Sequence, residues 1–499
     1  MNAVEAPPVR GFRFPRPDHR AVLLGLRAPQ VAILGTSVVM AVALLMAVPS
    51  IVGLAGAMVA FVVGVTAALL RLNGRAMDEW APLVLRWQAK RAAGQQRWVS
   101  PVPLLGDTSG HGEGAAPPPP LAGVTLLRVS RSVGGEVAVL KDARSGTFSA
   151  VVSCRGQAFA LLDGREQERL CALWGQAVAG FAHEGSPVCR LSWVEHSIPE
   201  DSDALEAYLV DNAVVGPEHL AYASYAELIA EAGPVSQRHE TYVVISVGGK
   251  RAKKAIRQAG GGDRGGCEVL LRELTTLTDR LRQADLDVDD VLGTRQLAGV
   301  LRVAFDPRSA RPVAERSRRD RKHGGVSGRN AWPMATESSW DHYRSDSGFH
   351  ATYWMAELPR RDVNAAFLHP LLIRPSGSHA VAVVMEPVPP SKAARAVESA
   401  HAAHVADEDL RSKAGYLPSA RRQREHEAIL AREAELSEGH AECRFSGYVS
   451  VSALGVAGLE HATAEIEQLG YDAQVELRRL YGEQDEAFTF TLPLGRGLR

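Results

Sequence analysis

The sequence lacks the features that mark a disulfide-stabilised secreted protein or a dedicated nucleic-acid binder. Its 499 residues include only five cysteines, an odd number with no Cys-x-x-Cys pair, so we predict buried thiols in a reducing compartment. The 56 basic and 57 acidic residues give a formal net charge of −1, which excludes a chain-wide positive field. Any contact with an anionic partner must therefore come from a local patch. The cysteines are scattered at positions 154, 171, 189, 267 and 443.

The sequence also lacks the loops that bind phosphate or activate a serine. A phosphate-binding loop needs Gly-x-x-x-x-Gly-Lys followed by Ser or Thr, but at 248–250 the glycine spacing differs and Arg251 replaces the hydroxyl. Gly-x-Ser-x-Gly is missing, and Ser376 lacks the nucleophile-elbow pattern. We therefore predict a non-enzymatic protein with no catalytic residue and no cofactor. A site built only from residues distant in the sequence is the alternative.

Two weaker patterns are compatible with ligand sites. His401 and His404 are spaced to share one helix face, but no carboxylate or third histidine completes a recognised metal pattern, so we predict no metal site. The glycine-rich stretch 260–266 is compatible with an anion at a helix N-terminus, but we favour a flexible loop opening a helix.

Charged residues are absent from a long apolar run between residues 28 and 70. One helix needs about 20 residues to cross the hydrocarbon core of a membrane, so this run is long enough for two crossings. Pro49 and Ser50 divide it, and proline disfavours a helix interior. The run begins too late and is too long for a cleaved signal peptide. The predicted transmembrane hairpin spans 31–72, with helices over 31–48 and 51–70.

Basic residues flank the apolar run on both sides. The positive-inside rule therefore places both flanks in the cytoplasm, which an even number of crossings satisfies. Trp80 and Trp87 follow in an amphipathic basic stretch that is predicted either to rest among lipid headgroups or to pack on the soluble part. The flanking residues are Arg10, Arg13, Arg16, Arg20 and Arg27 before the run, and Arg71, Arg75, Arg86, Lys90 and Arg91 after it.

Small residues recur every four positions along the second predicted helix, at Gly56, Ala60 and Gly64. Such a face lets another helix approach closely. We favour packing between the two helices of the hairpin. A homo-oligomer or partner interface on this face is the alternative.

The soluble part is predicted to be α+β, with mixed α/β lobes on the cytoplasmic side. A Pro-rich stretch ending at Pro120 predicts an exposed linker before the first lobe. The predicted divisions are an N-terminal cytoplasmic segment (1–30), the hairpin, a basic juxtamembrane segment with linker (73–120), a first α/β lobe (121–248), a helical and loop insertion (249–345) and a C-terminal lobe (346–499). The first lobe has predicted strands over 124–129, 136–140, 147–154, 189–194 and 241–247, a helix over 165–181 and a polar helical stretch over 204–230.

The C-terminal lobe has the most regular pattern, and its order of elements predicts a split βαβ sandwich. We expect its neighbouring aromatic residues to fill the core; they are Trp332, Trp340, Tyr343, Tyr353 and Trp354. The predicted strands cover 350–358, 379–386, 441–451 and 487–492, and the predicted helices 391–437 and 458–469. In the insertion, helices are predicted over 267–282 and 288–303.

A basic segment between residues 308 and 323 carries seven basic and two acidic residues without apolar periodicity. We predict a mobile surface loop. Clustered arginine also supplies affinity for the phosphates of DNA or anionic lipid, although no aromatic residue is interleaved to stack bases. The candidate contacts are Arg308, Arg311, Arg316, Arg318, Arg319, Arg321 and Lys322.

Two parts of the chain resemble bacterial conjugation or type IV secretion components. The start resembles the PrgI family of two-helix membrane proteins, through Phe12 to Pro17 with Leu24, Pro29 and Gln30. The soluble part is similar to the non-ATPase N-terminal region of the CagE, TrbE and VirB family of secretion ATPases. That likeness is carried by Trp193, Val194, Arg432, Glu433, Gly439, Phe445, Tyr448 to Val451 and Phe488 to Gly495.

The resemblance implies a PrgI-like anchor fused to an ATPase-like platform without the nucleotide-binding motor, and it implies no catalytic residue. The predicted function is a non-enzymatic inner-membrane scaffold of a type IV, conjugation-like secretion system that docks a separate ATPase at the cytoplasmic face. The implied partners are the bilayer, that ATPase and channel subunits. The alternative is a membrane-anchored protein that binds DNA or anionic lipid through the 308–322 segment.

Overall fold

The computed structural model describes the apolar run and most of the chain after it, but only two residues before it. The described residues are 12, 14, 28–72, 75–101, 116–131, 135–155, 159–199, 203–232, 237–319, 324–413 and 420–498.

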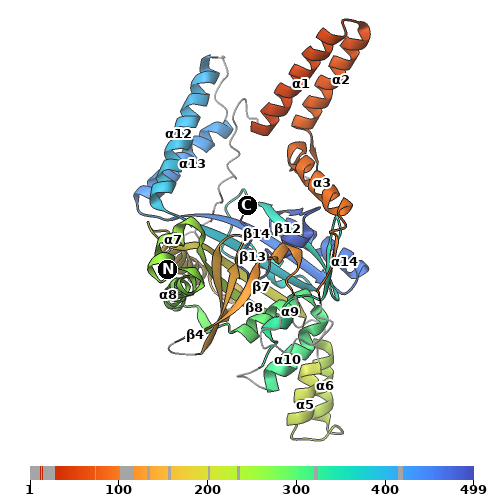
Figure 1. The fold of residues 1–499 in the computed structure, drawn as a ribbon. Helices are drawn as coiled ribbons and strands as arrows, with labels where there is room; N and C mark the ends of the chain where they lie inside the picture. The colour runs from red at the N-terminus through yellow and green to blue at the C-terminus, as the bar shows by residue number, and fades with distance from the viewer. Residues whose placement is uncertain are drawn as a thin grey trace, which may run out of the picture.

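Two apolar helices, α1 (Ala28–Ala47) and α2 (Ile51–Leu69), form an antiparallel hairpin that projects from the rest of the molecule (Figure 1). Ser50 caps the second helix, since its hydroxyl accepts a hydrogen bond from the Gly53 amide at 3.3 Å. Both helices are long and apolar enough to cross a membrane, and only 11% and 22% of their apolar windows are buried by protein. The predicted pair of helices is confirmed.

A short connection leads from the hairpin to the body. Strands β1 (Arg71–Leu72) and β2 (Arg75–Ala76) pair with each other, and helix α3 (Met77–Ala92) follows. Strand β3 (Arg97–Val99) then enters the main sheet beside β10 (Ala335–Ser338).

One antiparallel sheet of 13 strands forms the body. Its main path runs β3-β10-β11-β12-β14-β13-β7-β8-β6-β5-β4, with β15 paired to β12 and β9 paired to β6. The strands of the predicted first and last lobes therefore lie in a single sheet. The remaining strands are β4 (Val124–Ser130), β5 (Glu136–Asp142), β6 (Thr147–Arg155), β7 (Val188–Pro199), β8 (Gln237–Gly248), β9 (Asp287–Val291), β11 (Tyr343–Ser345), β12 (Gly348–Glu357), β13 (Ser378–Val388), β14 (Glu442–Ala453) and β15 (Glu476–Arg479).

The sheet contains the same arrangement twice. In the first half, β6 and β7 are parallel and separated by β8, while β9 flanks β6. In the second half, β12 and β13 are parallel and separated by β14, while β15 flanks β12. Each half is a split βαβ unit, and its first strand is also the third strand of a meander, β4-β5-β6 in the first half and β10-β11-β12 in the second. The predicted split βαβ type is confirmed, and a second copy of it lies in the first half.

The two halves join where β7 and β13 pair antiparallel, from Ser197 opposite His379 to Leu191 opposite Met385. Each half carries a helical pair between its second and third core strands. In the first half the pair is α5 (Asp203–Asn212) and α6 (Leu220–Ala232), and in the second it is α12 (Pro390–Lys413) and α13 (Ala420–Ser437). Because β7 and β13 run in opposite directions, the two pairs leave opposite ends of the sheet (Figure 1).

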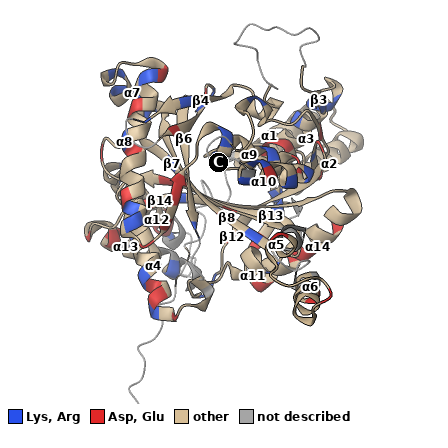
Figure 2. Cartoon of the chain, turned by 90° about the horizontal axis from the view of Figure 1, so that it is seen from below, with Lys and Arg blue, Asp and Glu red and all other residues tan. Residues whose placement is uncertain are grey.

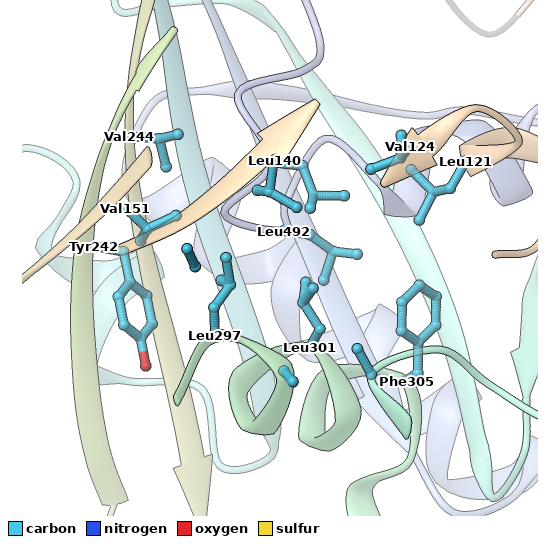
Figure 3. Close-up of a cluster of buried hydrophobic side chains, with 14 of the residues drawn as sticks. Leu121, Val124, Leu140, Val151, Tyr242, Val244, Leu297, Leu301, Phe305 and Leu492 are labelled. Carbon is cyan, nitrogen blue, oxygen red and sulfur yellow. The ribbon is translucent and has the colours of Figure 1, made fainter. Parts of the chain in front are cut away.

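Helices cover both faces of the sheet. One face packs against α4 (Gly164–Ala179), α8 (Gly262–Gln283), α11 (His369–Ile373) and α14 (Val456–Asp472), and Trp193 contacts the clusters of both halves. The other face packs against α9 (Thr294–Phe305) and against Phe488 of α15 (Gln484–Phe488). Figure 3 shows Leu297, Leu301 and Phe305 of α9 directed at strand residues such as Val151, with Leu492 beside them.

Most predicted elements are confirmed, but the predicted strand 487–492 is wrong. That stretch holds the end of α15 and consecutive turns, and the last strand is β15 instead. Phe488 and Leu492 are buried in the core on the second face of the sheet. Their apolar pattern therefore results from burial in the core and not from membership of a strand.

The predicted helix 288–303 is also wrong in its first part. Residues 287–291 pair with β6 as β9, and α9 begins only at Thr294. The predicted glycine loop is shorter than expected, because α8 already starts at Gly262. The predicted helix 391–437 is divided into α12 and α13, and their connection lies outside the described residues.

The basic segment is helical where the structure describes it, so the predicted surface loop is wrong there. A 3₁₀ turn (Pro307–Ser309) leads into α10 (Ala310–Arg319). Arginine is a good helix former, and Val313 anchors the helix by packing against the core cluster that contains α9.

Candidate functional site: membrane anchor and assembly surfaces

The two apolar helices pack through small residues. Gly64 lies against α1, because a Cβ there would meet Ser37 Cβ at 2.1 Å. Gln30 closes the base of the hairpin, since its Nε2 donates to the Ala68 carbonyl at 2.9 Å. Ala60 is half-buried, whereas Gly56 has open space where a Cβ would stand. Of the three predicted small residues, Gly64 therefore lies in the hairpin's own interface and Gly56 faces outward.

Helix α3 is fixed to the body by an aromatic cluster. Trp80 stacks on Trp340 with ring centroids 6.0 Å apart, and Trp87 meets the same ring edge-on at 5.0 Å. Tyr481 completes the cluster, 6.2 Å from Trp80. Of the two options for these tryptophans, packing on the soluble part is the observed one.

Ion pairs reinforce the contact between α3 and the body. Arg86 lies 3.2 Å from Glu483, and Lys90 lies 2.9 Å from Asp485. Beside them a cavity of about 480 Å³ is lined by α3 and the body, with Trp354 and Tyr448 on its far wall. Helix α3 and the body thus form one packed unit. The predicted core aromatics divide accordingly: Trp332, Tyr343 and Tyr353 are buried, whereas Trp340 and Trp354 are half-buried beside α3.

Two residues that precede α1 in the sequence, Phe12 and Phe14, also contact the body. Phe12 exchanges backbone hydrogen bonds of 2.8 and 3.1 Å with Val363, and Phe14 packs 5.1 Å from Phe367. Phe12 and Phe14, which precede the hairpin in the sequence, therefore lie against the body that follows it.

Helix α10 lies at the end of the body opposite α1 and α2 (Figure 1), and Figure 2 shows the basic residues along it. Arg308, Arg311, Arg316 and Arg318 are exposed there, and Arg311 pairs with Glu315 at 3.2 Å. Arg319 is the last residue of α10. Arg321 and Lys322 lie outside the described residues. The structure thus brings the described arginines together on one short helical segment.

Sequence reasoning did not single out the buried histidines, which alternate with apolar residues in strands. His350 is fully buried and bonded on both sides, with Ser345 Oγ 2.8 Å from Nε2 and Ser452 Oγ 2.7 Å from Nδ1. Burial lowers the pKa of His350 to about 3. A neutral ring held between two hydroxyls, without an acidic partner or access to solvent, stabilises the core and does not form a catalytic relay.

A second histidine lies beside a carboxylate and a hydroxyl. His239 Nδ1 is 2.8 Å from Ser197 Oγ and 3.1 Å from Glu195 Oε1. A Ser-His-acid relay uses the two ring nitrogens for the two partners. Both partners share one nitrogen here, so this arrangement does not pass a proton from the serine to the carboxylate.

The weaker sequence patterns have structural roles. Gly248 ends β8 with a φ of 156°, and a Cβ there would lie 2.5 Å from the Gly146 carbonyl oxygen. Arg251 donates to the Pro387 carbonyl at 2.7 Å and so ties α7 (Gly249–Gln258) to β13. His404 stacks on His426 of α13 at 4.9 Å, and no group of three or more metal-ligating side chains is present among the described residues.

The cysteines are all free, and two of them, Cys154 and Cys267, are buried. Burial raises the pKa of the Cys154 thiol to about 12, so this group stays protonated at neutral pH. The other three are only partly buried.

Comparison with known protein families shows that part of this chain is similar to a secretion-system component. Residues 235–355 match the family described as "Putative type VII ESX secretion system translocon, EccE". The matched region runs from β8 through α8, β9, α9 and α10 into β12, and so bridges the two halves of the sheet. No curated protein matches the chain. The match supports a membrane component of a secretion system, and it does not support the PrgI-like or ATPase-like resemblance.

Proposed function

We propose that this chain is a non-enzymatic, membrane-anchored scaffold subunit of a type VII secretion translocon. The match over residues 235–355 carries the proposal, because it names a type VII rather than a type IV system. The apolar hairpin supplies an anchor, and helix α3, which follows the hairpin in the chain, packs on the body through Trp340 and Asp485. Docking of a separate ATPase at the cytoplasmic face belongs to the same proposal.

The bilayer in this proposal is the bacterial inner membrane, with both flanks of the hairpin in the cytoplasm. The basic residues on both sides of the apolar run support this orientation through the positive-inside rule. The contact between Phe12 and Val363 supports a common side for the two flanks.

Affinity purification tests the scaffold role. The tagged, membrane-extracted protein is expected to bring down polytopic channel subunits and an ATPase of a type VII system, identified by mass spectrometry. ATP hydrolysis by the eluate is expected to disappear when that ATPase is depleted. Recovery of the chain alone, or with type IV subunits, would contradict the proposal, and hydrolysis by the isolated chain would reveal an enzyme.

The exposed arginines of α10 favour one alternative function, contact with nucleic acid. Anionic lipid fits less well, because α10 lies at the end of the body opposite the anchor (Figure 1). Replacing Arg308, Arg311, Arg316 and Arg318 by serine is the test. If the alternative holds, the parent protein binds duplex DNA with a steep salt dependence and the variant loses this binding.

A further inference from the structure

The helical pair α5–α6 presents apolar side chains to solvent at the end of the body opposite α1 and α2 (Figure 1). Leu220 is 87% exposed, Tyr225 58% and Leu228 56%. The sequence pattern predicts only a polar helical stretch here. An isolated exposed leucine is ordinary, but several large apolar residues grouped on one projecting helix mark an interaction surface.

Helix α6 has two apolar faces, and only one of them is covered. Tyr222, Ala226 and Ile229 are wholly or partly buried. Ala221, Tyr225 and Leu228 are exposed, and their spacing of four and three residues places them on one helix face. We call these three residues with Leu220 the α6 seam. A helix that is apolar on two faces needs a second packing partner.

The charge around the seam is of one sign. The stretch from 203 to 232 contains six acidic residues and no lysine or arginine. Glu218 and Glu227 are exposed close to the seam in the sequence. An apolar centre with an acidic rim is complementary to an apolar surface with a basic rim.

We propose that the α6 seam docks an amphipathic, lysine- or arginine-rich helix of a partner protein. The partner lays its apolar residues along Ala221, Tyr225 and Leu228, and its basic residues face the acidic rim. Helix-on-helix recognition of this kind uses anchors at the spacing that the seam presents. This inference does not depend on which secretion system the chain serves.

Charge and geometry disfavour the other occupants. Two copies of the same surface would oppose their acidic residues, which is repulsive. The basic helix α10 of a second copy supplies arginine, but its Val313 already packs on the core cluster. A bilayer that contains α1 and α2 lies at the other end of the body (Figure 1).

The test uses the full chain in nanodiscs of zwitterionic lipid and two synthetic helical peptides. Both peptides carry leucine at the same positions, and the remaining positions are lysine in one and glutamate in the other. By fluorescence anisotropy, the lysine peptide is expected to bind at least tenfold more tightly than the glutamate peptide. The double substitution Tyr225→Ser and Leu228→Ser is expected to weaken lysine-peptide binding at least tenfold. Ala223→Ser is the matched control, because Ala223 is exposed on another face of α6.

A photoreactive amino acid at position 228 tests the same surface in cells, with position 223 as the control site. The expected crosslinked peptide belongs to another protein, is rich in lysine or arginine, and has apolar residues at helical spacing. Crosslinks to a second copy of this chain, to lipid, or at equal yield from both positions would overturn the proposal. Equal binding of the two peptides, or lysine-peptide binding that the double substitution leaves unchanged, would overturn it as well. Circular dichroism and the unfolding temperature of the serine variant confirm that it is folded.

Discussion

At the residue scale, glycine decides how closely α8 approaches the sheet. Gly266 lies over the Phe148 ring of β6, where a Cβ would stand 2.4 Å from the ring carbon Cε2. Gly265 faces the end of α7, where a Cβ would stand 2.4 Å from the Ile256 carbonyl oxygen. These glycines lie inside the first turns of a helix, so their function is close packing and not loop flexibility.

The substitution Gly266→Ala is therefore expected to destabilise the protein, although alanine favours a helix. The added methyl group forces Phe148 or α8 to move, at a cost of about 1–3 kcal/mol. Urea unfolding of the detergent-extracted protein measures the change. Gly175→Ala in α4 is the control, because its Cβ meets nothing within 4 Å, and a gain of up to about 1 kcal/mol is expected. A neutral Gly266→Ala variant would contradict the packing argument.

Buried histidines make the stability depend on pH. Burial lowers the pKa of His350 to about 3, and it also lowers the pKa values of His196 and His379. In the unfolded chain a histidine has a pKa of about 6.5. Below that pH the unfolded chain binds protons that the native protein does not, so stability falls as the pH decreases from about 6.5 towards 3.

His350→Gln tests this dependence. The contribution of His350 to this loss of stability is at most about 1.4 kcal/mol per pH unit. The variant is expected to show a shallower loss of unfolding free energy between pH 6.5 and 5.5 than the parent protein. His183→Gln, the same substitution at an exposed position, is the matched control. An unchanged slope in His350→Gln would mean that the pKa of this histidine in the native protein is not lowered from its value in the unfolded chain.

At the element scale, the apolar hairpin has an inner and an outer glycine. Gly64 meets Ser37 of α1, whereas Gly56 points into open space. Close approach of membrane helices depends on small residues at the contact. Substituting each glycine in turn therefore distinguishes packing within the hairpin from packing against another molecule.

Gly64→Leu is expected to separate α1 from α2 and to lower the unfolding temperature of the detergent-extracted protein by several degrees. Gly56→Leu is expected to leave that temperature unchanged. Light scattering then reports the oligomeric state of the folded Gly56→Leu variant. A smaller particle would assign Gly56 to a contact between copies, and an unchanged particle would argue against one. Equal destabilisation by both substitutions would contradict the observed packing.

At the scale of the whole molecule, the pairing of β7 with β13 joins two similar units into one sheet. Ala382 of β13 is fully buried and lies opposite Val194 of β7. Both residues belong to the cluster that also holds α9 and Phe488. The two halves therefore share a core and are expected to unfold together.

Ala382→Asp places a charge in that shared core and is expected to cost more than about 4 kcal/mol. Hydrogen exchange is expected to show β6 and β8 losing protection together with β12 and β14. Thr125→Asp, exposed on β4, is the control and is expected to change stability by less than about 0.5 kcal/mol. Loss of protection confined to β12 and β14 would show that the halves are independent.

The sequence alone determined the features that depend on local composition. The uncharged run and Pro49 were enough to predict α1 and α2, because the length and apolarity of a spanning helix are properties of contiguous residues. Short runs of β-branched and apolar residues likewise predicted β6, β8 and β14. For the candidate site, the sequence supplied the small residues at 56, 60 and 64 and the basic cluster from 308.

Only the tertiary structure decided which of these features lie together. The duplicated sheet depends on pairing between strands far apart in the chain, such as β7 with β13, and single-strand patterns do not encode partners. Phe488 and Leu492 have strand-like apolar spacing, but they are buried beside helices and turns. The second apolar face of α6 became visible only once Tyr222, Ala226 and Ile229 were seen to be covered and Tyr225 and Leu228 were not, because exposure is a property of the fold.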